Sequence, residues 1–375
     1  MIARELEGLV RERLFREKAI VVIGPRQVGK TTLLRKIVSP FQDQTLWING
    51  DDPHARQRLT GVGIAELEVL IGSRRIVVID EAQRISEIGL TLKMVVDHFP
   101  GVQLLVTGSS SLDLAGETRE SLTGRKFEFF MYPLSCAELF THFGELQERP
   151  LLEHRLVYGQ YPDVVMNPGH EREILSQLAS SYLYKDLFIQ ETIRKPVILE
   201  KLLQALALQV GQEVVYRELG QLIAIDPVTV ERYIDLLEKA FVVFKLPSLS
   251  RNARNEIKKG RKIYFYDNGV RNAIINNFNP PELRQDIGAL WENFLISERR
   301  KTNEYRLRFA NLFFWRTHTQ QEIDYIEERD GRLYAYEFKW NPRKSASLPN
   351  AFARNYPGSI FHSVTPENFL SFIRD

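Results

Sequence analysis

Residues 24–31, GPRQVGKT, constrain this chain more than any other segment, because they match the phosphate-binding pattern GxxxxGK[ST]. The apolar run at residues 19–23 predicts a buried parallel strand before the loop, and residues 31–37 predict a helix after it. Aligned N–H groups at a helix N-terminus attract phosphate, so the segment predicts a nucleoside triphosphate site. The residues expected to hold ATP are Gly24, Pro25, Arg26, Gln27, Val28, Gly29, Lys30, Thr31 and Thr32.

Within this segment, Lys30 is expected to reach the β- and γ-phosphates and the Thr31 hydroxyl to coordinate Mg²⁺. A second predicted strand, residues 75–79, is apolar from Ile76 onward and is followed by Asp80 and Glu81. Asp80 is expected to hold Mg²⁺ through water, and Glu81 to orient and deprotonate the attacking water. The alternative is that this acidic pair caps the next helix.

A third predicted strand, residues 103–107, is followed by Ser109. Its hydroxyl is expected to position the lytic water, but a serine-rich turn that caps the next helix explains it equally well. Arg119 and Arg125 come next, and either is suited to act as an arginine finger across a subunit interface. Hydrolysis would then require a homo-oligomer. The alternative is an ordinary surface arginine.

Four segments taken together, residues 24–33 (GPRQVGKTTL), 80–83 (DEAQ), 107–110 (TGSS) and 122–125 (LTGR), resemble the prokaryotic AAA-type ATPases. More narrowly, the chain is similar to the subfamily whose C-terminal domain is long catalogued as of unknown function. The resemblance covers nearly the whole chain and implies an ATPase. The pattern usually has Gly-Gly where this chain has Gly159-Gln160, which is expected to change a turn and leave the nucleotide site unaffected.

Composition sets the remaining limits. A chain of 375 residues predicts two or three domains, and a net charge of +2 means that any nucleic-acid contact must come from local patches. The single cysteine, Cys136, excludes an internal disulfide and a Cys-rich zinc site, which suits a reducing compartment. No apolar stretch reaches the roughly 18 residues of a membrane span. We therefore expect a cytoplasmic protein with no membrane partner.

The middle of the chain predicts a winged helix-turn-helix. Asp226-Pro227 signals a helix start, and two strand-like segments, 241–246 and 262–266, enclose a basic loop. The predicted recognition helix carries Glu231, Asp235 and Glu238, a poor set for a DNA major groove, so we expect backbone or shape recognition of DNA. The alternative is a structural adaptor with a solvated loop. The expected phosphate contacts are Arg251, Arg254, Lys258, Lys259, Arg261 and Lys262.

The C-terminal segment predicts a helix at 287–296 and three strands, at 312–315, 322–326 and 333–339, the last two joined by an Asp330-Gly331 turn. The order of acid on a helix, then Asp, then Glu-x-Lys, resembles the restriction-endonuclease-like fold. The resemblance implies nuclease residues at Glu292, Asp324, Glu337 and Lys339, with Asp324 and Glu337 holding a second cation, Mg²⁺ or Mn²⁺. Exchanged salt bridges or a site that only binds remain open as alternatives.

The expected fold class is α/β, in four parts. These are an AAA-type P-loop ATPase core (1–130), a helical lid and connector (131–195), a winged helix-turn-helix (196–278) and a small restriction-endonuclease-like domain (282–375). The expected function is Mg²⁺-dependent ATP hydrolysis coupled to DNA binding, in an oligomeric motor or remodeller of duplex or branched DNA. An ATP-dependent switch acting on a protein partner is the alternative.

Overall fold

The computed structural model describes residues 1–109, 122–182, 196–250, 260–344 and 346–374. The chain divides into two compact units. The first comprises Met1–Leu134 with Lys239–Phe241, and the second comprises Ser135–Glu238 with Val242–Asp375. Among the helices of the described residues, none has both the length and the apolarity needed to cross a bilayer. The predicted division into four parts stays a prediction.

The first unit contains a five-stranded parallel sheet of order β2-β3-β4-β1-β5. Strands β1, β3 and β4 are buried along their whole length, which explains why each reads as a continuous apolar run. The segments that follow these strands meet at one edge of the sheet, because all the strands run the same way. The strands are β1 Ala19–Ile23, β2 Thr45–Asn49, β3 Ile76–Asp80, β4 Gln103–Gly108 and β5 Lys126–Phe130.

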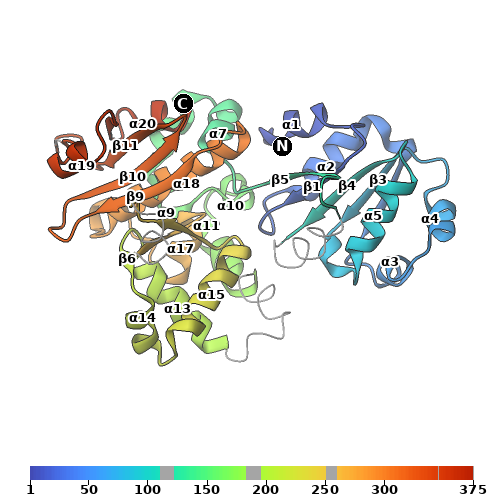
Figure 1. Cartoon of the computed structure of the whole chain (residues 1–375), viewed down its shortest axis with the longest axis horizontal. Helices are drawn as coiled ribbons and strands as arrows, with labels where there is room; N and C mark the ends of the chain where they lie inside the picture. The colour runs from blue at the N-terminus through green and yellow to red at the C-terminus, as the bar shows by residue number, and fades with distance from the viewer. Residues whose placement is uncertain (110–121, 183–195, 251–259, 345, 375) are drawn as a thin grey trace. The chain divides into compact units, whose positions relative to one another are not determined.

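Helices cover this sheet, and Figure 1 shows α2 and α5 packed along it. Helix α2 presents an apolar face that includes Leu33, Leu34 and Ile37, all buried, and α5 likewise buries Leu92 and Val95. The helices are α1 Leu6–Glu12, α2 Lys30–Val38, α3 Pro53–Leu59, α4 Ile64–Ile71 and α5 Ile88–His98, with short 3-10 helices η1 Ser39–Gln44 and η2 Ala82–Arg84. The strand and helix predicted around the phosphate-binding segment are confirmed as β1 and α2.

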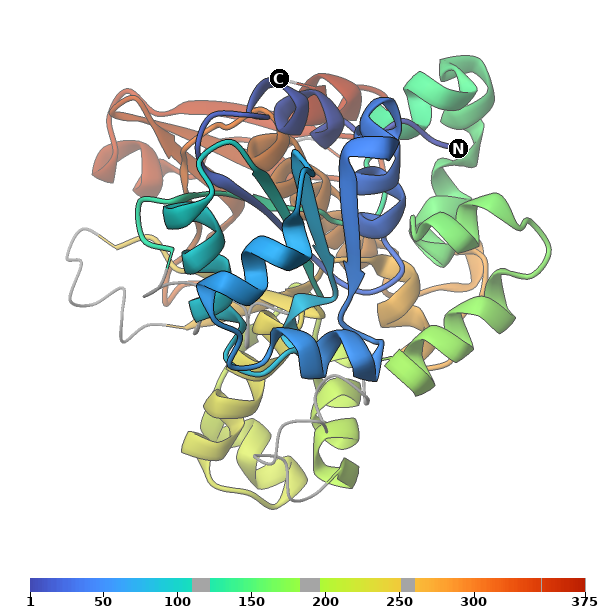
Figure 2. The same ribbon diagram turned by 90° about the vertical axis from the view of Figure 1, so that its right-hand side faces the viewer.

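In the second unit, three helices gather beside a three-stranded antiparallel sheet of order β6-β8-β7 (Figure 1, Figure 2). The Asp226 side chain caps α15 by accepting a hydrogen bond from the Thr229 N–H at 2.9 Å, as the Asp-Pro signal predicted. Residues 213–214 form a strand, and the next helix begins only at Tyr216. The elements are α13 Pro196–Leu208, β6 Glu213–Val214, α14 Tyr216–Ile223, α15 Pro227–Lys239, β7 Val243–Pro247 and β8 Arg261–Phe265.

A four-stranded mixed sheet of order β12-β11-β10-β9 occupies the C-terminal part of this unit, with α18 running along it (Figure 1). Asp330 and Gly331 have φ values of +51° and +71°, so the predicted turn between β10 and β11 is confirmed. Trp315, Ile323 and Phe352 belong to the core of this sheet. The elements are α18 Ile287–Tyr305, β9 Asn311–Arg316, β10 Glu322–Arg329, β11 Arg332–Phe338, α19 Asn350–Asn355, β12 Ile360–Val364 and α20 Phe369–Arg374.

The remaining helices of the second unit include two whose ends are connected by a buried polar network around Asp267. The Asp267 carboxylate accepts hydrogen bonds from the N–H groups of Gln160 at 2.7 Å and Val270 at 3.1 Å. Gly159 has φ +70°, and a Cβ there would lie 2.1 Å from Asp267 Oδ1, so glycine is required. These helices are α7 Cys136–Phe143, α8 Glu145–Glu148, η3 Arg149–Leu151, α9 Leu152–Tyr158, α10 Pro162–Met166, α11 Glu171–Gln177, the π-helix η4 Leu178–Tyr182, α17 Asn268–Ile274 and η5 Pro281–Leu283.

Candidate functional site

The phosphate-binding segment joins β1 to α2 and contains two glycines that a residue with a side chain could not replace without strain. Gly29 has φ +97°, and a Cβ on Gly24 would lie 2.0 Å from the Met131 carbonyl oxygen. The buried Lys30 Nζ donates to the Gly24 and Pro25 carbonyls, both at 2.8 Å. No side chain caps the N-terminus of α2. N–H donors without a side-chain cap and a nearby ammonium make this loop suited to an anionic phosphate chain.

Asp80 lies at the carboxyl end of β3 and connects three segments of the first unit. Its Oδ1 accepts hydrogen bonds from the hydroxyls of Thr31, at 3.1 Å, and Thr107, at 2.5 Å. The Thr107 hydroxyl in turn accepts the Glu81 N–H at 2.9 Å. A hydroxyl and a carboxylate are ligands that Mg²⁺ prefers, so Thr31 and Asp80 fit the cation that accompanies ATP.

Glu81 is held by an amide from its own loop. Its backbone is left-handed, with φ +52°, and its Oε2 accepts a hydrogen bond from Gln83 Nε2 at 2.6 Å. The same Gln83 nitrogen lies 2.7 Å from the hydroxyl oxygen of the buried Ser109. The structure thus brings the predicted Glu81 and Ser109 together through Gln83. This glutamine and Thr107 had no predicted role, and Thr107 lies here only because β3 and β4 are adjacent.

Arg4 was also missed from the sequence. Its guanidinium donates from Nη1 to the Val28 carbonyl at 2.5 Å and from Nη2 to the Tyr132 carbonyl at 2.7 Å. The residue precedes α1, so the N-terminal segment of the chain supports the backbone of the phosphate-binding loop. The sequence signal for this role is limited to the charged, amphipathic character of residues 1–7.

Arg125 lies just before β5, at the amino end of the sheet, whereas the phosphate-binding segment follows β1 at the carboxyl end. Its Nε is 2.6 Å from Asp97 Oδ1 in a partly exposed ion pair. Five strand residues span about 16 Å, so this guanidinium cannot reach the nucleotide site of its own chain. If Arg125 acts as an arginine finger, it must act at the nucleotide site of another copy of the chain. Arg119 lies outside the described residues.

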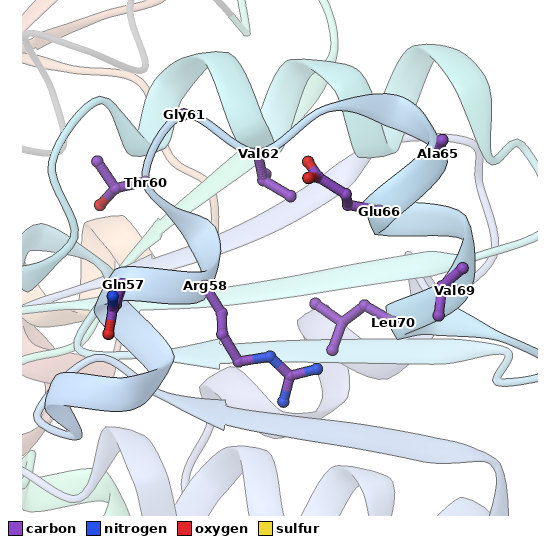
Figure 3. Close-up of a pocket in the computed structure, with 9 residues that line it drawn as sticks. All are labelled: Gln57, Arg58, Thr60, Gly61, Val62, Ala65, Glu66, Val69 and Leu70. Atoms are coloured by element: carbon purple, nitrogen blue, oxygen red, sulfur yellow. The ribbon is translucent and has the colours of Figure 1, made fainter.

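A pocket of about 620 Å³ opens between α3 and α4, where Figure 3 shows Arg58 of α3 and Leu70 of α4 among the lining side chains. Its lining also includes Gly61, Val62 and Glu66. No residue of the phosphate-binding segment lines it, so this hollow is separate from the nucleotide site.

The basic loop of the middle region is described only at its end. Arg261 Nη1 lies 3.0 Å from Glu231 Oε1 and 2.9 Å from the Tyr216 hydroxyl. Lys262 is only 1% exposed and forms ion pairs with two carboxylates of the C-terminal part. The predicted phosphate contact at Lys262 is therefore wrong, because its ammonium is buried and already neutralised. Arg251, Arg254, Lys258 and Lys259 lie outside the described residues.

The acidic residues of α15 form ion pairs with basic residues of the same unit. Lys245 on β7 forms ion pairs with both Asp235 and Glu238, and Arg261 on β8 pairs with Glu231. Burial alone would lower the pKa of Lys245, but hydrogen bonds and charge from the two acids raise it above its ordinary value. These acids therefore face the small sheet, and the exposed side of α15 carries Arg232.

The C-terminal acidic residues also lie close together. Asp324 and Glu337 face each other across β10 and β11, because Tyr325 pairs with Tyr336 in an antiparallel register. Lys339 Nζ lies 2.7 Å from Glu337 Oε1. Burial raises the pKa of Asp324 well above its usual range, and the carboxylates of Glu292 and Glu337 raise it further.

A metal ion does not fit this cluster as it stands. The Glu292 Oε1 atom accepts hydrogen bonds from Lys262 Nζ at 2.9 Å and from the Tyr264 hydroxyl at 2.5 Å. In the part of the chain that the structure describes, no group of three or more His, Cys, Asp or Glu side chains is arranged to hold a metal. The predicted second cation at Asp324 and Glu337 thus finds no support.

Three family models match successive parts of the chain. Residues 16–140 match the model described as AAA domain. Residues 149–281 and 287–365 match two domains of unknown function, DUF8612 and DUF4143. The parallel sheet, the phosphate-binding loop and the Asp80 cluster lie in the first matched part. The N-terminal unit thus combines a match to the AAA domain model with a parallel sheet and a phosphate-binding loop.

The chain is similar along most of its length to proteins that are described as uncharacterized. A Mycobacterium tuberculosis protein is 28% identical over 351 residues, which are 92% of this chain and 75% of the relative. A Methanocaldococcus jannaschii protein is 22% identical over 339 residues, 84% of this chain and 73% of the relative.

Among solved structures, the Thermotoga maritima RuvB Holliday junction branch migration motor is 15% identical with a TM-score of 0.34. The match covers 70% of this chain and 92% of that one.

Proposed function

We propose that this protein is a Mg²⁺-dependent ATPase whose hydrolysis is coupled to DNA binding, in an oligomeric motor or remodeller of duplex or branched DNA. The observation that carries the ATPase part is the Asp80 cluster, in which one carboxylate links Thr31 of the phosphate-binding loop to Thr107 beside Glu81. Binding, metal-coordinating and water-activating groups thus converge at one sheet edge.

The residues divide the work of hydrolysis. Lys30 exchanges the carbonyls of Gly24 and Pro25 for phosphate oxygens when nucleotide binds. Thr31 and Asp80 would hold Mg²⁺, and the cation would neutralise charge that develops on the phosphates. Glu81 orients a water molecule and removes its proton, and Gln83 with Ser109 fixes the direction of the Glu81 carboxylate.

The DNA part is supported by the arrangement of α13, α14 and α15 beside the β6-β8-β7 sheet, which we interpret as a winged helix-turn-helix. In the sequence, the acidic residues of α15 made binding in a DNA major groove unfavourable. Ion pairs with Lys245 and Arg261 compensate part of this negative charge, so the acidic residues repel a DNA backbone less than the sequence indicated. Arg232, an exposed basic residue of α15, is then suited to meet a phosphate.

The second candidate is an ATP-dependent switch that acts on a protein partner. It is favoured by the net charge of only +2 and by the loss of Lys262 as a phosphate contact, since its ammonium is buried in ion pairs. Such a switch would hydrolyse ATP slowly, and its rate would not respond to DNA.

Steady-state ATP hydrolysis separates these functions. The wild type and Glu81→Gln are assayed alone and with single-stranded, duplex and four-way branched DNA at physiological salt. We expect one DNA form to stimulate the wild-type rate several-fold and the substitution to abolish both basal and stimulated hydrolysis. Arg232→Ala should reduce the stimulation and leave the basal rate unchanged. A rate that no DNA changes would favour the protein-partner switch.

A further inference from the structure

Lys262 is a buried charged residue of the second unit. The proposed ATPase function gives it no role. It lies on β8, is 1% exposed, and its Nζ is 2.9 Å from Glu292 Oε1 on α18 and 2.5 Å from Glu322 Oε1 on β10. The Phe314 ring centroid lies 5.4 Å from the same nitrogen. A buried ammonium needs carboxylate partners of this kind, because isolated charges are costly to remove from water.

The surroundings of Lys262 are strongly acidic. Glu292 and Glu322 contact it directly, and Asp324 and Glu337 lie beside them, with Lys339 bonded to Glu337. We call Glu292, Glu322, Asp324 and Glu337 the acid cluster. Burial works to lower the pKa of Lys262, yet the charges of Glu292, Asp324 and Glu322 raise it above its ordinary value. The ammonium therefore stays charged at neutral pH and serves as the counter-ion of the cluster.

We infer that Lys262 is a tethered cation that occupies the acid cluster in place of a divalent metal ion, and that the cluster becomes a metal site only when this ammonium is removed. Both ions seek the same carboxylate oxygens, and the lysine is supplied at fixed position by its own strand. The inference joins Lys262 on β8 to carboxylates on α18, β10 and β11 of the second unit, and it does not depend on the proposed ATPase function. It implies that the intact chain does not cut nucleic acid with a metal at this cluster.

Manganese binding to the full chain tests the inference, with free Mn²⁺ counted by electron paramagnetic resonance. An Asp80→Asn background without nucleotide keeps metal from the ATP site. We expect no Mn²⁺ to bind this parent below about 1 mM, a weak range for protein cation sites. Adding Lys262→Met should create one site per chain, at least about tenfold tighter, and adding Asp324→Asn as well should abolish it. Lys339→Met is the matched control, since it also removes a lysine from the cluster but is expected to create no site.

Three results would overturn the inference. The first is Mn²⁺ binding in the parent that Asp324→Asn abolishes, and the second is an equal gain in Lys339→Met. The third is a folded Lys262→Met variant that binds no Mn²⁺. If this variant is too unstable to titrate, Mn²⁺ should raise its melting temperature, because a ligand that binds only the folded state stabilises it. The absence of such a rise also overturns the inference.

Discussion

At the scale of single residues, Gln83 deserves a direct test because one amide nitrogen contacts both Glu81 and Ser109. We expect Gln83→Ala to lower kcat about tenfold, equivalent to about 1.4 kcal/mol, because the Glu81 carboxylate loses its fixed direction. KM for ATP should stay unchanged, since no contact joins Gln83 to Lys30 or Thr31 among those described. Steady-state kinetics at saturating Mg²⁺ measure both constants.

The control for this prediction is the same substitution in Glu81→Gln. A residue that acts through Glu81 has no further effect once the carboxylate is gone, so the double variant should match Glu81→Gln alone. If Gln83→Ala instead raises KM and leaves kcat intact, the amide belongs to nucleotide binding and our assignment fails.

At the scale of elements, the Gly159 turn joins α9 to the buried network around Asp267. Gly159→Ala combines φ +70° with a Cβ placed 2.1 Å from Asp267 Oδ1, so we expect it to lower the free energy of unfolding by about 3 kcal/mol. Gly169→Ala is the matched control in the same unit, because φ is +94° there but nothing lies within 4 Å of the added carbon. It should cost only about 1 kcal/mol.

Denaturant unfolding followed by tryptophan fluorescence measures this difference. Trp291, Trp315 and Trp340, three of the four tryptophans, lie in the second unit and report on it. Equal losses for the two variants would mean that backbone strain alone decides the cost and that the Asp267 contact relaxes freely.

Local patterns predicted the elements well and the charge partners poorly. The strand before the phosphate-binding loop, the Asp226 cap and the Asp330-Gly331 turn depend on neighbouring residues, and all three are confirmed. The partners of Lys262 lie 30 and 60 residues further along the chain, at Glu292 and Glu322. Sequence periodicity does not predict contacts between residues so far apart. The basic loop was therefore predicted to contact phosphate as a whole, although its last lysine is buried.

The nucleotide site shows the same limit. Lys30, Thr31, Asp80 and Glu81 follow from motif spacing, because each lies in or directly after a recognisable strand or loop. Thr107 joins them only because β4 lies between β1 and β3. Sequence alone gives the strands but not their order in the sheet, which depends on packing against helices.

At the scale of the whole molecule, Arg125 tests whether copies of the chain complete one another. It lies at the opposite sheet edge from its own nucleotide site, so a finger role requires a neighbouring copy. We expect Arg125→Ala and Glu81→Gln each to lose nearly all ATPase activity alone. Mixing them should restore part of it, because some sites then combine an intact Glu81 with an intact Arg125 from another copy.

ATP turnover in mixtures of varied ratio, with sedimentation to confirm mixed oligomers, measures this recovery. Mixed oligomers without recovery would leave Arg125 as a surface residue paired with Asp97. Full activity in Arg125→Ala alone would lead to the same conclusion.

The burial of Lys262 also limits how the chain can be cut. The matched parts end at residue 281 and resume at 287, so a fragment chosen from those limits would separate Lys262 from Glu292 and Glu322. The C-terminal piece would keep its carboxylates and lose their counter-ion, and the other piece would keep a lysine with no acid beside it. A chimaera that exchanges either part with a relative must therefore keep Lys262 and its two glutamate partners together.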